Sequence, residues 1–194
     1  MLKFGTAGLR GPLGDGPDAM NVATVTAATA GVAAWLRERC LGGGLVVVGR
    51  DARHGSAEFA AAAAEVFAGA GFPVLLFDRP IPTPVLAFTV RARDAVAGVQ
   101  ITASHNPPGD NGYKVYLAGG AQLIPPADAE IERHIAAVGD FAAVARTPVD
   151  PAPDSDELVR RYLDRVTGLA QSPLDERAAL PAGRPPGHAA WREA

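Results

Sequence analysis

The chain alternates short apolar runs with longer segments in which apolar residues recur at helical spacing. The apolar runs have the length and β-branched content of strands buried on both faces, and they lie at 45–49, 73–77 and 95–101. The helical segments lie at 19–40, 56–67 and 84–92. Because helices and buried strands alternate with short connections, the pattern predicts an α/β domain with a mainly parallel sheet covered on both faces.

After the third strand the pattern becomes less regular. Residues 102–114 are rich in Pro, Gly, Asp and Asn, and we expect them to form a loop. Two short apolar pieces, 115–117 and 121–124, flank a pair of glycines and predict a hairpin. Residues 126–135 predict a further helix, with Pro and acidic residues in its first turn.

The carboxyl-terminal part of the chain predicts less structure. Three prolines in 139–154 indicate a linker, and helical spacing predicts a last helix at about 156–169, with Ser155 as its cap. Residues 172–194 are rich in Pro, Arg, Gly and Ala, have no periodicity, and predict no element.

Two local features near the amino terminus carry further expectations. Residues 4–16 contain five glycines and are expected to be a loop that holds Thr6 and Arg10. The planar, permanently charged guanidinium of Arg10 suits phosphate, although spacing alone favours a solvated side chain. Ser56 has the chemistry of an N-cap for the second helix.

Composition excludes several classes of protein. The 194 residues are 48% hydrophobic and carry a net charge of −3, with basic residues scattered along the chain, which argues against nucleic-acid binding. No apolar stretch reaches the roughly 18 residues of a membrane span, and no secretory signal opens the chain. The single cysteine, Cys40, excludes an internal disulfide and is expected to be a buried small residue at a helix end. These features together predict a cytoplasmic protein.

The polar residues after the strand at 95–101 are the candidate chemistry. Ser104, His105 and Lys114 lie at the end of a buried strand, where open α/β sheets place their sites. The chain has only two lysines, Lys3 and Lys114. It contains no P-loop, dinucleotide fingerprint, nucleophile elbow or zinc spacing. A phosphate-handling site and a long surface turn remain as equal alternatives on this chemistry alone.

The segment Thr102-Ala-Ser-His-Asn-Pro107 resembles the phosphoserine loop of the α-D-phosphohexomutases, the phosphoglucomutase/phosphomannomutase family. Four further segments agree in order and spacing: Phe4-Gly-Thr-Ala-Gly-Leu-Arg10, Gly49-Arg-Asp51, Pro82-Thr-Pro84 and Asp110-Asn-Gly-Tyr-Lys114. The continuation Gly119-Gly-Ala-Gln-Leu-Ile124 is most similar to the branch that contains phosphoglucomutase-2, phosphopentomutase and certain bacterial phosphomannomutases.

The resemblance implies a role for each site residue. Ser104 would carry a phosphoryl group, exchange it with a hexose phosphate through a bisphosphate intermediate, and bind Mg²⁺ through a phosphate oxygen. Lys114 would act as general base or charge stabiliser, and His105 would assist it. Arg10, with Thr6 nearby, would hold phosphate oxygens. Hexose 1,6-bisphosphate would be the activator, and the reaction would be that of an intramolecular phosphotransferase acting on glucose or mannose phosphates.

The resemblance also implies a three-layer αβα domain with a mainly parallel or mixed sheet, the first domain of a four-domain family. On that basis residues 1–140 would be domain I, 141–171 a linker and helix leading to domain II, and 172–194 an irregular tail. The Asp-Gly-Asp-x-Asp-Arg metal motif of the family's second domain is absent. We therefore expect the remaining metal ligands and mutase domains to lie outside this sequence, through truncation or a frameshift, and the fragment alone to be inactive.

Two other interpretations stay open. The chain could be a non-catalytic α/β module that binds phosphate or a protein partner. Alternatively, the missing domains could be supplied by a separate subunit. The choice among glucose, mannose and pentose substrates is open, because the loops that select the sugar are not in this sequence.

Overall fold

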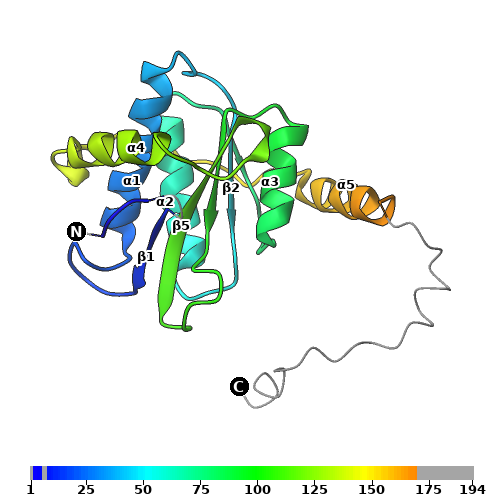
Figure 1. The fold of residues 1–194 in the computed structure, drawn as a ribbon, viewed down its shortest axis with the longest axis horizontal. Helices are drawn as coiled ribbons and strands as arrows, with labels where there is room; N and C mark the ends of the chain where they lie inside the picture. Colours follow the sequence, from blue (N-terminus) through cyan, green and yellow to red (C-terminus); the bar gives the residue numbers. More distant parts are fainter. Residues whose placement is uncertain (1, 6–7, 170–194) are drawn as a thin grey trace. The chain divides into compact units, whose positions relative to one another are not determined.

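The computed structural model describes residues 2–5 and 8–169 (Figure 1). The strands are β1 (Leu9–Pro12), β2 (Val46–Arg50), β3 (Val74–Leu76), β4 (Ala97–Ile101) and β5 (Asp110–Leu117). The α-helices are α1 (Val22–Glu38), α2 (Ser56–Gly69), α3 (Thr83–Ala92), α4 (Ala127–Ala136) and α5 (Ser155–Thr167). The chain divides into two compact units, Met1–Tyr162 and Leu163–Ala194, and the first contains the whole sheet. The tail expected at 172–194 lies outside the described residues.

The five strands form one mixed sheet in the order β1-β5-β4-β2-β3. Strand β2 is parallel to both β3 and β4, whereas β5 runs antiparallel to β4 and β1. Helices α1, α2 and α4 lie on one face of the sheet and α3 lies on the other (Figure 1). The predicted three-layer αβα fold with a mainly parallel or mixed sheet is confirmed.

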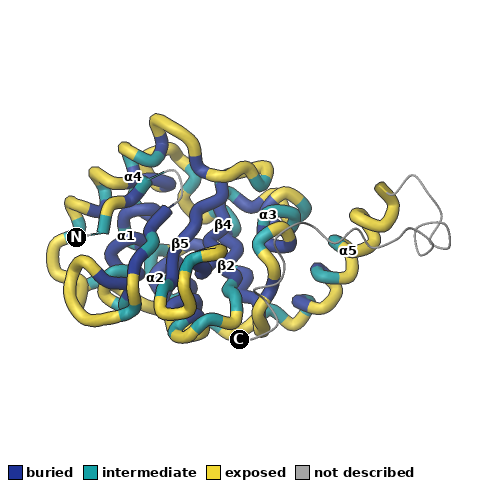
Figure 2. Tube along the Cα trace, turned by 60° about the horizontal axis from the view of Figure 1, so that its bottom comes forward, coloured by how far each residue is buried: buried dark blue, intermediate teal, exposed yellow. Residues whose placement is uncertain are grey.

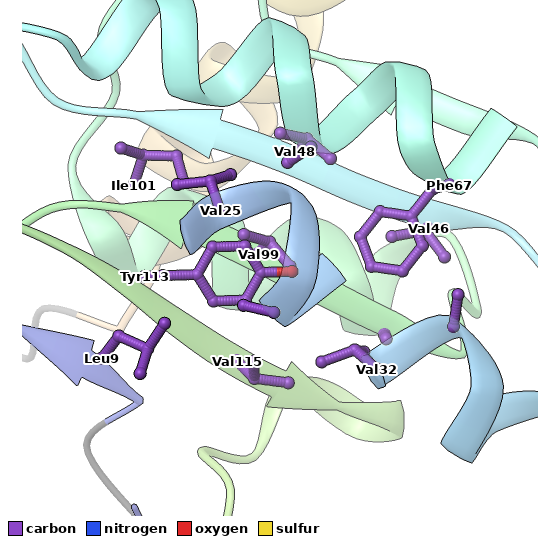
Figure 3. Close-up of a cluster of buried hydrophobic side chains, with 14 of the residues drawn as sticks. Leu9, Val25, Val32, Val46, Val48, Phe67, Val99, Ile101, Tyr113 and Val115 are labelled. Atoms are coloured by element: carbon purple, nitrogen blue, oxygen red, sulfur yellow. The ribbon is translucent and has the colours of Figure 1, made fainter. Parts of the chain in front are cut away.

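Alternation along the strands divides the core between the two faces. Val46 and Val48 of β2 pack under α1 and α2, while Val47 between them packs under α3. Figure 3 shows the larger cluster, and Figure 2 shows buried residues concentrated along β2, β4 and β5. Gly98 of β4 faces α3, and a Cβ there would lie 2.4 Å from Val90 Cγ2, so only glycine admits this close helix.

The predicted helices are present, but their starts differ in detail. Helix α1 is capped by Asn21, whose Oδ1 accepts a 2.9 Å bond from the amide of Thr24. The predicted cap at Ser56 is wrong: Gly55, with φ 75°, is the N-cap of α2, and Ser56 is already helical. The prediction for Cys40 is also wrong, because Cys40 is exposed and has φ 59° just beyond α1.

Two segments expected to be loops are strands. The glycine-rich segment 4–16 contains the edge strand β1, and β5 begins at Asp110 inside the segment expected to be irregular. The glycines permit this pairing: a Cβ on Gly112 would lie 2.5 Å from the Thr102 carbonyl oxygen. The predicted hairpin is reduced to a short 3₁₀ turn at Ala118–Gly120 and a single bridge between Tyr116 and Gln122.

The segment 139–154 crosses the surface with one short 3₁₀ helix, Phe141–Ala143, and is tied down by backbone bonds from Thr147 to Glu65 and from Ala152 to Leu76. Among the described helices, none has both the length and the apolar composition that crossing a membrane requires.

Candidate phosphate site

The candidate residues gather where the parallel strands β2 and β4 end. The amide of Asp51, directly after β2, donates a 3.0 Å bond to the carbonyl of Ile101 at the end of β4. The loop that follows each strand therefore starts from the same edge of the sheet, which is where α/β folds place ligands.

Ser104 lies exposed in the loop after β4, in an unusual backbone conformation. Its φ is 62°, in the left-handed region that costs an L-residue other than glycine about 1–2 kcal/mol. Its amide donates a 2.9 Å bond to Thr102 Oγ1. A strained residue fixed by its surroundings is frequent at functional sites.

Lys114 reaches the same serine from β5. It stands opposite Gln100 of β4 and is buried, with only 8% of its surface exposed. Its Nζ lies 3.4 Å from Ser104 Oγ, at the long end of hydrogen-bond range. Burial lowers the pKa of Lys114, the positive charge of Arg10 lowers it further, and the carboxylate of Asp51 acts in the opposite direction.

Arg10 shares a face of the sheet with Lys114. It pairs with Gly112 across β1 and β5, two residues before Lys114, and alternation places both side chains on the face opposite α1. A Cβ on Gly112 would lie 3.2 Å from Arg10 Cγ, so the arginine stem passes over this glycine. Arg10 Nε is buried and has no hydrogen-bond partner among the described residues. Two neighbouring cations beside a serine hydroxyl favour an anionic ligand.

The loop after β2 contributes Asp51, which belongs to the segment Gly49-Arg-Asp51 but was given no role from the sequence, and Arg53, which the sequence did not single out. Asp51 Oδ1 accepts from the Arg53 amide at 3.0 Å and from Ser56 Oγ at 2.7 Å, and Asp51 Oδ2 lies 3.2 Å from Arg53 Nε. The Arg53 guanidinium also donates to carbonyl oxygens of the serine loop, those of Ser104 (2.9 Å), Asn106 (2.8 Å), Pro107 (2.7 Å) and Asp110 (3.2 Å). The sequence could have indicated Asp51 and Arg53 only by their position, because they follow β2, a strand that neighbours β4.

Asn111, at the start of β5, joins the serine loop to the start of α2. It is fully buried, and its Nδ2 donates to the carbonyl of His54 at 2.9 Å and to Ser56 Oγ at 3.0 Å. Its Oδ1 accepts from the amide of Gly112 at 2.7 Å. The side chain has no contact with the candidate anion position, so its role is structural.

The structure thus brings Ser104 and Lys114 into contact and places Arg10 on the face of Lys114. His105 is exposed, and its side chain makes no hydrogen bond or ion pair with another described residue. Thr6 lies outside the described residues.

The donor set for a divalent cation is incomplete in the part of the chain that the structure describes. No group of three His, Cys, Asp or Glu side chains is arranged to hold a metal there. Asp51 is already engaged by Arg53 and Ser56. A phosphoryl oxygen on Ser104 would be a single ligand for Mg²⁺, which takes six, so these residues alone do not make a magnesium site.

A family model described as phosphoglucomutase/phosphomannomutase, alpha/beta/alpha domain I, matches residues 1–140. A Haemophilus influenzae protein named "Probable phosphomannomutase" is 44% identical over 136 residues, which are 66% of this chain and 27% of that protein. The phosphoribomutase of Saccharomyces cerevisiae is 38% identical over 179 residues, 86% of this chain and 29% of that protein.

Among solved structures, a Thermus thermophilus protein provisionally assigned as a phosphomannomutase superposes with a TM-score of 0.65 at 35% identity, covering 78% of this chain and 32% of that chain. The chain spans about a quarter of the length of the curated relatives it matches.

Proposed function

Because the chain belongs to the phosphoglucomutase/phosphomannomutase family, as its alpha/beta/alpha domain I, we propose that it is the phosphoserine-bearing domain of a phosphohexomutase. Its Ser104 accepts a phosphoryl group from a hexose 1,6-bisphosphate and returns it to a hexose monophosphate. The full reaction interconverts the 1- and 6-phosphates of the sugar, with the remaining domains supplied outside this sequence.

The observation that carries the proposal is the contact between Ser104 and Lys114. The exposed hydroxyl lies 3.4 Å from a buried amine, with Arg10 on the same face. Charge on a transferring phosphoryl group spreads over its equatorial oxygens, and neighbouring cations stabilise it.

The transfer to serine balances as follows. The oxygen of Ser104 forms a bond to phosphorus, while the bond from phosphorus to the sugar oxygen breaks. The serine proton passes to the neutral amine of Lys114, the leaving sugar oxygen takes a proton from water, and the sugar leaves as a monophosphate. The lowered pKa of Lys114 brings the neutral amine closer to physiological pH. Once the phosphoryl group is on Ser104, the resulting ammonium of Lys114 faces it as a counter-charge.

The names of the relatives cover mannose, ribose and glucose phosphates, so we leave the sugar open within the hexoses and pentoses. As domain I alone, with an incomplete donor set for Mg²⁺, the chain should perform the half-reaction at Ser104 but sustain little turnover.

A stoichiometric burst tests the proposal. The purified chain is mixed with glucose 1,6-bisphosphate and MgCl₂, and glucose 6-phosphate is measured by a coupled dehydrogenase. We expect at most one equivalent of product per chain, and none from the variant Ser104→Ala. An absent burst would favour a non-catalytic phosphate-binding or partner-binding module, and sustained turnover would contradict the need for further domains.

A further inference from the structure

We propose that Arg53 is a positioning residue that holds the loop 104–110 in one conformation and so presents the Ser104 hydroxyl to Lys114. The contact between Arg53 and the loop is a property of the fold. Its importance for phosphoryl transfer rests on the proposed function.

The two terminal nitrogens of the Arg53 guanidinium make four hydrogen bonds, and Nε forms an ion pair. Nε lies 3.2 Å from Asp51 Oδ2, one terminal nitrogen donates to the carbonyls of Pro107 and Asp110, and the other donates to those of Ser104 and Asn106. The terminal N–H groups of Arg53 are therefore all engaged by the loop and are not available to a phosphate. Arg53 therefore differs in kind from Arg10, whose Nε lacks a partner among the described residues.

The Ser104 end of the loop needs an outside support, because its other hydrogen bonds are local. Ser104 is in the left-handed region, and the neighbouring residues are mostly exposed, so apolar packing contributes little. The amides of Ser104, Asn106 and Asp110 bond to Thr102 Oγ1, Ala103 O and Pro107 O, all within or beside the loop. The far end of the loop is also attached to β1, through the bond from the Leu13 amide to the Gly109 carbonyl and the pairing of Asp110 with Pro12. The four carbonyls that converge on Arg53 supply the long-range attachment at the Ser104 end.

Arg53 is held in place by Asp51, which is itself bonded to α2 and β4. The carboxylate of Asp51 accepts a hydrogen bond from the Ser56 hydroxyl at the start of α2, and the Asp51 amide donates to the carbonyl of Ile101 at the end of β4. The carboxylate balances the charge of Arg53, so the pair fixes the loop while adding no net positive charge beside Lys114.

Lysine should not replace this arginine. An ammonium has three donors that radiate from one nitrogen, whereas the guanidinium presents five in a planar fork that reaches four separate carbonyls. The variant Arg53→Lys therefore keeps the positive charge but loses the planar set of donors that reaches the four carbonyls. Arg50 offers a matched control, because it is also at the end of β2 and its side chain makes, among the described residues, only a 3.4 Å bond to the neighbouring Asp51 carbonyl.

Hydrogen exchange measured by mass spectrometry on the full chain tests the contact without requiring any activity. In Arg53→Lys and Arg53→Ala we expect exchange of the Ser104, Asn106 and Asp110 amides to accelerate about tenfold or more, with the α1 and β2 amides unchanged. Arg50→Ala should stay within about twofold of the parent chain. Equal exchange in Arg53→Lys and Arg50→Ala would overturn the inference. Arg53→Lys decides the question if Arg53→Ala does not fold.

A second readout follows the site itself. The side-chain NMR signals of the two lysines separate Lys114 from Lys3 in the parent chain. Arg53→Lys adds a third lysine signal, and adding Lys114→Arg to either chain assigns the signal of Lys114. Loosening the loop should admit water and raise the pKa of Lys114 in Arg53→Lys, while general destabilisation of the fold would leave that pKa unchanged. If the parent chain gives no burst with glucose 1,6-bisphosphate while these effects are present, the proposed function fails and the role of Arg53 in the loop stands.

Discussion

Replacing Asn111 should loosen the framework under the site at a cost that the structure allows us to work out. Asn111→Ala removes three side-chain hydrogen bonds, to His54, Ser56 and Gly112. Ser56 Oγ keeps its bond to Asp51, so it is not left without a partner. The buried amide of Gly112 loses its partner, which costs about 1–3 kcal/mol, and the carbonyl of the exposed His54 loses a hydrogen bond worth about 1 kcal/mol. We expect a loss of about 3 kcal/mol in the free energy of unfolding.

Thermal and urea denaturation measure this loss. About 3 kcal/mol corresponds to a fall of about 6–12 °C in Tm for a chain of this size. The variant should remain folded at 25 °C, since domains are typically stable by 5–15 kcal/mol. A fall of less than about 2 °C would refute the claim that these three bonds hold the start of β5 to α2.

The isosteric variant Asn111→Asp adds a test of burial. The new carboxyl keeps an acceptor for Gly112 but faces the His54 carbonyl with no donor when ionised, and burial raises its pKa in the folded state. A raised pKa means that its contribution to stability is present below the unfolded value of about 3.9 and is lost as pH rises. The loss relative to the parent chain should therefore be larger at pH 7 than at pH 4, and a loss independent of pH would contradict it.

Three further substitutions test the site. Lys114→Met should raise Tm slightly at pH 7, because the lowered pKa of Lys114 means that its charged form destabilises the fold. This gain in Tm should vanish as the pH approaches the ordinary lysine pKa of 10.5, and a lower Tm at pH 7 would contradict the prediction. In urea, the free energy of unfolding of Ser104→Gly should be about 1 kcal/mol higher than that of Ser104→Ala, because glycine accepts φ 62° without strain. The reverse order would refute backbone strain at this residue. Gly112→Ala should lower the free energy of unfolding by about 3 kcal/mol, because its Cβ would lie 2.5 and 2.8 Å from the Thr102 and Leu9 carbonyl oxygens. The control Gly109→Ala, where a Cβ would meet open space, should lower it by less than about 0.5 kcal/mol. Equal losses would contradict the close approach at Gly112.

The buried strands and amphipathic helices could be predicted from the sequence because burial imposes a visible period. Val46 to Val48 form a continuous apolar run of the kind that parallel strands buried on both faces require. The edge strand β1 has no such run. Its pairing depends on β5, which is far away in the sequence, as the pair Leu9 and Tyr113 shows, so local pattern could not reveal it.

Part of the candidate site could also be predicted from the local sequence pattern. Ser104 follows a recognisable strand and lies in a specific motif, so both its place and its exposure could be predicted. Lys114 was expected in a loop, but it is buried on β5, where the ladder with β4 fixes its distance from Ser104. The contacts of Arg53 are to backbone carbonyls, which leave no trace in residue types, and only the folded loop reveals them.

The most direct test of the central claim is the position of the phosphoryl group itself. After incubation with glucose 1,6-bisphosphate and MgCl₂, the chain is digested and the peptide that contains Ser104 is sequenced by mass spectrometry. The account predicts one phosphate on Ser104, greatly reduced in Lys114→Met. An unmodified Ser104, or a phosphate on a different residue, would contradict it.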